Sequence, residues 1–83
     1  MKVAVRYFAS IREALGSGEA FDAEPGTTVG QLRDRLLARD AAHAAALARG
    51  RALRVALNQS LSDEAARLAE GDEVAFFPPV TGG

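Results

Sequence analysis

The chain has 83 residues, the size of a single domain with one thin hydrophobic core. Its 10 basic and 11 acidic residues leave a formal net charge of −1, so charge gives no reason to bind nucleic acid or an anionic membrane surface. The absence of cysteine excludes disulfides, thiolate metal ligands and a persulfide held on a side chain.

Two strands and a short helix are predicted at the start of the chain. Residues 1–8 alternate between two sets of side chains, as in a strand with one buried face. Helix-forming residues 9–15 follow and stop at the Gly-Ser-Gly run of residues 16–18. Alternation resumes at residues 19–23, and residues 24–26 form a turn. We expect a hairpin with a short helix in its loop.

The main helix is predicted to begin after Thr27 or Thr28. Gln31 lies three residues beyond Thr28, which is the spacing of a capping box. Apolar residues then recur on one helical face, at Val29, Leu32 and Leu36. This face is expected to cover the sheet.

An alanine-rich stretch follows the main helix. Residues 41–49 have helical composition and stop at Gly50. Asp40 precedes this stretch, and the sequence leaves open whether the helix breaks there. The role of residues 40–49 is likewise left open.

The last third of the chain is predicted to be mostly extended. Residues 53–58 alternate as a strand, and residues 59–63 form a turn or a brief added strand. Residues 65–68 are expected to make one helical turn. Residues 73–77 form a final strand of β-branched and aromatic residues that ends at two prolines.

This order of elements predicts an α+β fold of the β-grasp, ubiquitin-like type. A mixed sheet of four to five strands packs against one main helix. The first and last strands can lie side by side in the middle of the sheet. We expect a β-grasp domain over residues 1–77 and an extended, flexible functional tail over residues 78–83.

The tail has the composition of a segment that enters another protein. Pro78 and Pro79 fix the backbone in an extended direction, and six residues reach about 20 Å. Gly82 and Gly83 carry no side chains, so they can thread a narrow channel. The terminal carboxylate is then open to activation by ATP as an acyl-adenylate, and a sulfur nucleophile can convert the adenylate to a thiocarboxylate.

Three segments resemble the small, sulfur-carrying subunit of molybdopterin synthase. The strongest is GDEVAFFPPVTGG at residues 71–83. KVAVRYFASIRE at residues 2–13 and VALNQ at residues 55–59 support it. The resemblance implies a β-grasp fold and a sulfur carrier in molybdenum cofactor biosynthesis, which is not catalytic by itself.

The resemblance also implies roles for the tail residues. Gly83 bears the sulfur, Gly82 and Thr81 thread the channel, and docking falls to Phe77, Pro78, Pro79 and Val80. The implied partners are the large subunit of molybdopterin synthase in a heterotetramer, a ubiquitin-activating-type adenylating enzyme that consumes ATP, and a sulfur donor. In the synthase the thiocarboxylate donates sulfur to a cyclic pyranopterin precursor. No cofactor is expected to be bound.

Alternation within the last strand separates its two aromatic residues. Phe76 is in phase with Val74 and is expected in the core, whereas Phe77 faces outward. Phe8 is in phase with Phe77 across the sheet, and together they would form an exposed apolar patch that serves as an interface. Arg12, on the first short helix, is a further candidate for partner contact.

Other classes of function lack the residues they need. His43 is the single histidine, so we expect no metal site and place it at the surface or at a packed edge. No apolar run is long enough to span a membrane and no signal peptide opens the chain, so a cytoplasmic protein is expected. Two alternatives stay open: a sulfur carrier of another pathway, such as thiamine synthesis, and a ubiquitin-like protein modifier.

Overall fold

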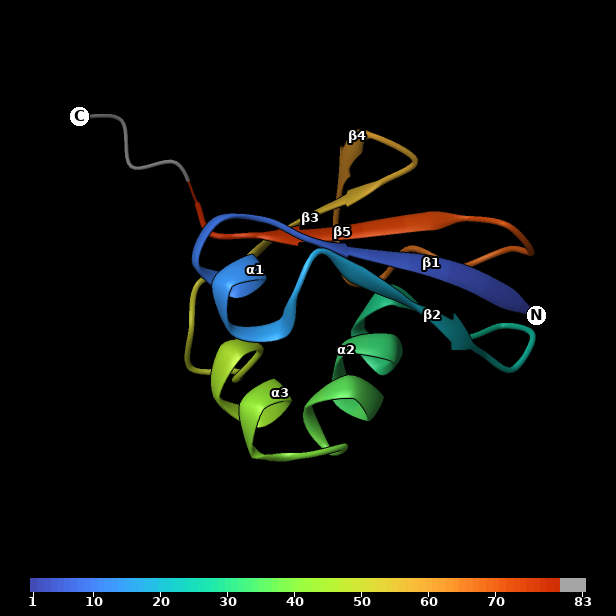
Figure 1. Ribbon diagram of the computed structural model, residues 1–83. Coiled ribbons are helices and arrows are strands. Elements are labelled where there is room, and N and C mark those ends of the chain that lie inside the picture. The colour runs from blue at the N-terminus through green and yellow to red at the C-terminus, as the bar shows by residue number, and fades with distance from the viewer. Residues whose placement is uncertain (80–83) are drawn as a thin grey trace.

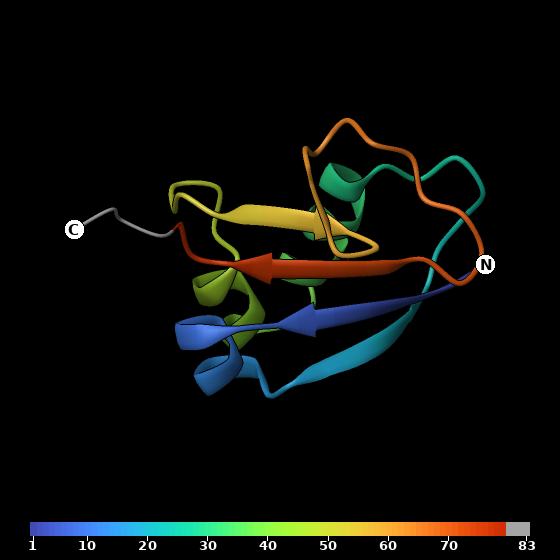
Figure 2. The ribbon, with the colours of Figure 1, turned by 90° about the horizontal axis from the view of Figure 1, so that it is seen from above.

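The first and last strands lie side by side in the centre of a five-stranded sheet (Figures 1 and 2). The computed structural model describes residues 1–79. In it β1 and β5 run parallel, while the other neighbours in the order β2-β1-β5-β3-β4 are antiparallel. The strands are β1 (Lys2–Tyr7), β2 (Gly18–Asp22), β3 (Arg54–Leu57), β4 (Ser60–Ser62) and β5 (Glu73–Phe77). The predicted mixed sheet and ubiquitin-like α+β class are confirmed.

The helices form a second layer on one face of the sheet (Figure 1). They are α1 (Ala9–Leu15), α2 (Val29–Leu37) and α3 (Ala41–Ala46). The predicted capping box is present at α2, because the Thr28 side chain accepts from the Gln31 amide and the Gln31 side chain accepts from the Thr28 amide. The expected main helix is therefore α2, and the two shorter helices complete the layer.

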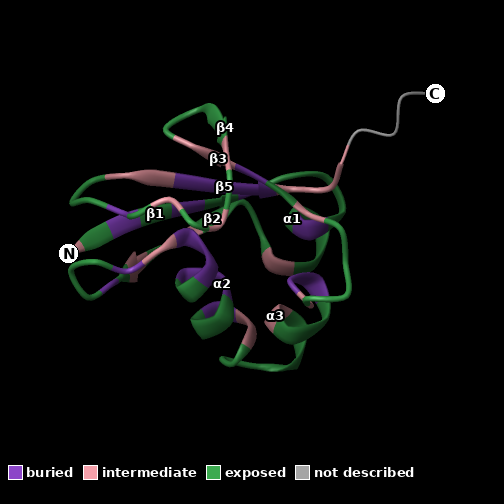
Figure 3. Cartoon of the chain, turned by 180° about the vertical axis from the view of Figure 1, so that it is seen from behind, coloured by how far each residue is buried: buried purple, intermediate pink, exposed green. Residues whose placement is uncertain are grey.

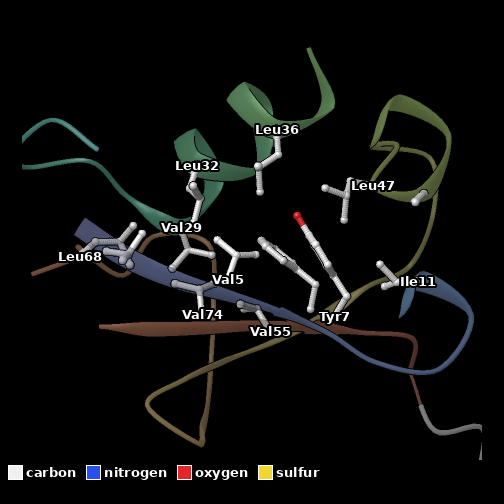
Figure 4. Packing of buried hydrophobic residues seen from close by; sticks show 13 residues of the cluster. Val5, Tyr7, Ile11, Val29, Leu32, Leu36, Leu47, Val55, Leu68 and Val74 are labelled. Carbon is white, nitrogen blue, oxygen red and sulfur yellow. The ribbon is translucent and has the colours of Figure 1, made fainter. Parts of the chain in front are cut away.

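The core lies between the two layers. The inward side chains of β1 are buried at every second residue, as the alternation predicted. They pack against the apolar face of α2, against Ile11 of α1 and against Leu47 at the end of α3 (Figure 4). Figure 3 marks the buried residues along the strands and helices. Fully buried large residues are Val5, Tyr7, Ile11, Val29, Leu32, Leu36, Leu47, Val74 and Phe76.

The alanine-rich stretch forms a separate helix. Asp40 has extended backbone angles, and its carboxylate accepts a hydrogen bond of 2.8 Å from the His43 amide. Asp40 is therefore the N-cap of α3, which settles the question of a break. The expectation of helix up to Arg49 is wrong, because α3 ends at Ala46 and the carbonyls beyond it are bound by a buried arginine.

The predicted helical turn at residues 65–68 is also wrong. This segment is not helical, and Arg67 forms an isolated bridge with Thr28. The amides of Val29 and Gly30 donate to the carbonyls of Ala66 and Glu64, both at 2.9 Å. The first amides of a helix have no partner inside the helix, so α2 takes two acceptors from this segment, which forms a turn at residues 64–65 and then the bridge at Arg67.

Arg33 joins the helix layer to the chain that leads into β3. Arg33 is 4% exposed, and its guanidinium donates to the carbonyls of Leu47 at 2.8 Å and Ala48 at 2.6 Å. The third contact is an ion pair with Glu64 at 2.7 Å. Burial raises the pKa of Glu64, but hydrogen bonds from Arg49 and Arg33 outweigh it and lower that pKa below its ordinary value.

Replacing Arg33 is expected to destabilise the domain strongly. Arg33→Met leaves the Leu47 carbonyl and one oxygen of the Glu64 carboxylate without their donor and removes the Arg33 bond to the Ala48 carbonyl, so we expect the free energy of unfolding to fall by about 3 kcal/mol. Urea unfolding followed by circular dichroism measures this. The matched control is Arg35→Met on the exposed side of α2, expected within about 0.5 kcal/mol of the parent. Equal losses from both variants would show that Arg33 is not an anchor.

The two aromatic residues at the end of β5 are expected to differ in their effect on stability. Phe76 is 1% exposed and stacks on Tyr7 with ring centroids 6.5 Å apart, whereas Phe77 is half-buried. Phe76→Ala should cost about 3 to 5 kcal/mol by opening a cavity. Phe77→Ala should cost about 1 kcal/mol or less. Chemical unfolding of both variants checks the difference, and a larger loss from Phe77→Ala contradicts the assignment of the two faces.

Candidate functional site

The predicted working end of the protein is rooted in the central strand of the sheet. β5 pairs with β1 on one side and with β3 on the other, up to the pairing of Arg54 with Phe77. Pro78 and Pro79 follow and have no amide hydrogen to donate, so the pairing of β5 ends there. The other tail residues assigned a role, Val80, Thr81, Gly82 and Gly83, lie outside the described residues. What the structure supplies is the root of the tail and its surroundings.

The outward side chains next to this root form a row across three strands. Arg54 of β3 is the register partner of Phe77, so both lie on the outer face of the sheet. Tyr7 pairs with Phe76, so the next residue, Phe8, lies beside Phe77 on the side of β5 opposite to Arg54. The amide of Phe8 donates to the Phe76 carbonyl at 3.2 Å and fixes this position. The predicted neighbourhood of Phe8 and Phe77 is thus present.

A second row, one step down the strands, has small side chains at its centre. Ala75 pairs with Arg6 on one side and Ala56 on the other, and Ala56 pairs with Leu61 of β4. Because an alanine side chain ends at Cβ, the side chains rise less far above the sheet in this row than in the aromatic row. Leu61 is 68% exposed and continues the apolar surface to the edge of the sheet.

The two rows enclose a shallow hollow of about 520 Å³ on the outer face of the sheet. Its apolar lining comes from both rows. Its lining residues, which define the outer-face hollow, are Arg6, Phe8, Ala56, Gln59, Glu73, Ala75 and Phe77. Among residues 1–79 the exposed large apolar side chains are Phe8, at 38%, and Leu61, and both lie at this surface. An exposed apolar patch on a small domain often marks a site of protein–protein interaction.

Charged groups surround the apolar surface. The Arg6 guanidinium lies 5.7 Å from the centre of the Phe8 ring and 3.7 Å from a carboxylate oxygen of Glu73. Arg54 is exposed and makes no ion pair with any residue of the part of the chain that the structure describes. The surface therefore offers a cation beside its aromatic row, suited to a carboxylate on a partner.

Arg12 lies apart from the outer-face hollow. It is exposed on α1, in the helix layer, and its side chain makes no hydrogen bond to residues 1–79. Since β1 and β5 are parallel, α1 follows Phe8 at the same end of the sheet where β5 ends. A partner that covers that end could reach Arg12, and its role stays a prediction.

Sequence reasoning missed several residues of this surface. Leu61 falls within residues 59–63, which are predicted as a turn or brief strand with no contact role. Its signal was present, because it is a lone apolar residue between two polar pairs in Gln-Ser-Leu-Ser-Asp. Ala56 and Ala75 gave no signal, because the hollow exists only when β3 and β5 pair in this register.

Other kinds of site find no support in the described part of the chain. No three His, Asp or Glu side chains of residues 1–79 gather where they could hold a metal ion. In the same residues no helix is both long and apolar enough to cross a membrane. His43 lies at a packed edge, as expected, with a side chain that is 11% exposed.

Comparison with known proteins identifies the family. The model of the ThiS family matches residues 5–83. The molybdopterin synthase sulfur carrier subunit of Escherichia coli is 43% identical over 81 residues, covering 98% of this chain and 99% of the relative. The subunit of the same name from Haemophilus influenzae is 39% identical over 79 residues, covering 95% and 96%.

Solved structures agree with the fold. Subunit 1 of a putative molybdopterin converting factor from Pyrococcus furiosus has a TM-score of 0.81 at 27% identity, covering 96% of this chain and 99% of that one. Small archaeal modifier protein 1 of Haloferax volcanii has a TM-score of 0.78 at 30% identity, covering 95% and 98%. A complex of subunits 1 and 2 of molybdopterin-converting factor from Helicobacter pylori matches with a TM-score of 0.69 at 30% identity and covers both chains fully. With the parallel β1–β5 pair, the Gly-Gly ending and these relatives, the chain belongs to the ThiS family, among the ubiquitin-like sulfur carrier subunits of molybdopterin synthase.

Proposed function

We propose that this chain carries sulfur on its C-terminal Gly83 and delivers it within molybdopterin synthase, in molybdenum cofactor biosynthesis. The observation that supports this most is the continuity of β5 with the tail. β5 lies at the sheet centre and leads directly into Pro78-Pro79-Val80-Thr81-Gly82-Gly83. A rigid root and a slender end are what a carrier needs to present one carboxyl group inside another protein. Relatives that cover nearly the whole chain bear the name of this carrier.

The chemistry begins with an inert group. An oxygen of the Gly83 carboxylate attacks the α-phosphorus of ATP on a ubiquitin-activating-type enzyme, and pyrophosphate leaves. Hydrosulfide supplied by the donor attacks the carbonyl carbon of the acyl-adenylate, and AMP leaves. The product is a thiocarboxylate, whose sulfur bonds to a cyclic pyranopterin precursor; water then cleaves the acyl–sulfur bond, which leaves the sulfur on the pterin and restores the Gly83 carboxylate. ATP is consumed by the activating enzyme, and the carrier itself holds no cofactor.

Catalysis belongs to the partners in this scheme. The carrier contributes the reacting terminus and a surface that brings it to the right place. The outer-face hollow, with Phe8 and Phe77 at its rim, is the proposed docking surface for the large subunit, joined by Pro78, Pro79 and Val80 as the tail leaves the sheet. The complex of subunits 1 and 2 from Helicobacter pylori supports a large-subunit partner. Two carriers on a large-subunit dimer would give a heterotetramer.

A protein modifier is the second candidate function. It is favoured by the likeness to the Haloferax volcanii modifier, which equals the likeness to the Helicobacter pylori subunit in identity. A modifier would form an isopeptide bond from Gly83 to a lysine of a target. This chain has one lysine, Lys2, so chains of linked copies would have a single lysine side chain for attachment.

Sulfur loading is expected at the C-terminal carbonyl. Incubation of the protein with ATP, its activating enzyme and a sulfur donor should replace one oxygen by sulfur, and intact mass spectrometry with fragment mapping should place the change at Gly83. Deleting Gly83 should abolish loading without unfolding the domain, because the residue lies beyond the last strand. A truncated chain that still loads sulfur would refute the mechanism. Covalent adducts to lysines of other proteins, in place of sulfur loading, would favour the modifier.

Filling the outer-face hollow is expected to weaken docking. Ala56→Gln places a longer side chain on the floor of the hollow, and we expect the dissociation constant for the large subunit of molybdopterin synthase to rise about tenfold or more. Isothermal titration calorimetry measures it. Ala44→Gln makes the same change on an exposed residue of α3 in the other layer and should leave the affinity unchanged. Equal affinities for both variants would place the docking surface elsewhere.

A further inference from the structure

A cluster of hydrogen-bonded ionisable groups lies at the opposite face of the domain, between α3 and β2. His43 of α3 stands between two carboxylates. Its Nδ1 is 2.8 Å from Oδ1 of Asp40, and its Nε2 is 2.8 Å from Oε2 of Glu19. We call His43, Glu19, Asp40, Arg39 and Tyr7 the His43 cluster. None of these residues lines the outer-face hollow, and the proposed sulfur chemistry uses none of them.

The geometry sets the protonation state of the imidazole. An ionised carboxylate can only accept hydrogen bonds, so a ring nitrogen at 2.8 Å from it must carry a proton. Both ring nitrogens have such a neighbour. His43 therefore makes both contacts only as the imidazolium cation, and a neutral ring would turn a lone pair toward one of the two carboxylates.

The remaining groups of the cluster hold Glu19 in place. The Tyr7 hydroxyl donates to Oε2 of Glu19 at 2.7 Å, and Arg39, in the link between α2 and α3, is ion-paired with Oε1. Burial is the largest cause that raises the pKa of Tyr7, so the hydroxyl keeps its proton and remains a donor. The rings of Tyr7 and His43 meet edge to face with centroids 6.4 Å apart. Glu19 thus accepts from three elements of the fold.

The groups that contact the imidazole or its carboxylate partners come from several parts of the fold, whereas in α2 Arg33 pairs with Glu64 and Asp34 pairs with Arg49. β1 contributes Tyr7, β2 contributes Glu19, and the link after α2 contributes Arg39. α1 carries Arg12 and Glu13, and neither is hydrogen-bonded to the cluster in the described part of the chain. The net charge of the five groups, with His43 protonated, is zero, and loss of one proton leaves it at −1.

The pKa values follow from these contacts. Burial lowers the pKa of His43, but the hydrogen bonds to Glu19 and Asp40 outweigh it and raise that pKa above its ordinary 6.5. Burial raises the pKa of Glu19, but hydrogen bonds from His43, Tyr7 and Arg39 lower it below 4.5. The hydrogen bond from the His43 amide, and then that from the ring, lowers the pKa of Asp40.

The two ends of α3 are held by different forces. Its C-terminal end is fixed by the buried side chain of Leu47, 0% exposed, and by the guanidinium of Arg33 on the Leu47 and Ala48 carbonyls. Neither contact changes charge near neutral pH. The N-terminal end is fixed by the His43 cluster, which does change.

We propose that the His43 cluster is a proton-operated latch, which holds the N-terminal end of α3 on the sheet layer while His43 is charged and releases it when His43 loses its proton. Release breaks the contact of His43 with Glu19 and leaves Leu47 and the Arg33 anchor in place. The opening is therefore local to the link at Arg39 and the first turn of α3.

The sign of the pH dependence follows from the direction of each shift. The raised pKa of His43 means that its contribution to stability is complete below about pH 6.5 and is lost as the pH rises through the native value. The lowered pKa of Glu19 means that its contribution is complete above about pH 4.5 and is lost as the pH falls. The latch is therefore fully closed between these two values, and on the alkaline side it opens as His43 loses its proton.

Nuclear magnetic resonance of the full-length protein tests the latch. With a single histidine, the imidazole signals need no assignment by mutation. We expect both ring nitrogens to be protonated at pH 6, a His43 pKa above 6.5, and a lower pKa in Glu19→Gln. Above the native pKa the hydrogen-exchange protection factors of the His43 and Ala44 amides should fall, while that of Leu47 holds. In His43→Gln the protection factor of the Ala44 amide should be low at every pH.

Two outcomes would overturn the latch. One is a His43 that titrates at or below 6.5 and does not respond to Glu19→Gln. The other is a raised pKa with protection at Ala44 that stays constant through the titration, because the charge would then hold nothing in place. Asp40→Asn keeps an N-cap oxygen while removing the charge, so it separates loss of the latch from loss of the helix cap. Circular dichroism at pH 6 confirms that each variant is folded.

Discussion

The parallel pairing of β1 with β5 is the constraint on which the rest of the structure depends. It joins the two ends of the described chain at the centre of the sheet, with Val5 beside Val74 and Tyr7 beside Phe76 on the core side. Parallel neighbours need a long crossover, and here every other element lies within that crossover. The pairing also ends where the tail begins, so the tail starts from a strand that is paired on both sides. Under the proposed function, this pairing would set the direction in which the carrier presents its terminal carboxyl group.

The two faces of the sheet differ in the side chains that they carry, and therefore in what covers them. The inner face buries branched and aromatic residues under three helices. The outer face carries alanines at its centre, with Phe8, Phe77 and Leu61 around them, and no element of residues 1–79 covers it. In so small a domain a single strand serves both faces: β5 supplies Phe76 to the core and Phe77 to the outer face. The apolar face left open is what the proposed large-subunit partner would cover.

Ion pairs hold segments that the small hydrophobic core does not fix by itself. Glu64 stands between Arg33 and Arg49 and holds the loop of residues 63–68 against α2, while Glu19 holds α3 through His43. The two clusters differ in one respect that matters. Arginine keeps its charge at any physiological pH, so the first cluster is permanent, whereas the histidine makes the second responsive. No residue of either cluster lines the outer-face hollow, so changes in them need not disturb the proposed docking.

The sequence by itself determined the strands with clean alternation, the capped main helix, and the ending that points to sulfur transfer, because each depends on residues close together in the chain. It placed Phe76 inside and Phe77 outside for the same reason. Tertiary structure decided what local pattern could not. Residues 63–68 form a turn and a bridge that supply acceptors to the first amides of α2, and the chain beyond Ala46 leaves the helix where Arg33, fourteen positions before Leu47, binds the Leu47 carbonyl. The outer-face hollow and the His43 cluster likewise depend on strand register and on contacts between residues far apart in sequence, which no single segment encodes.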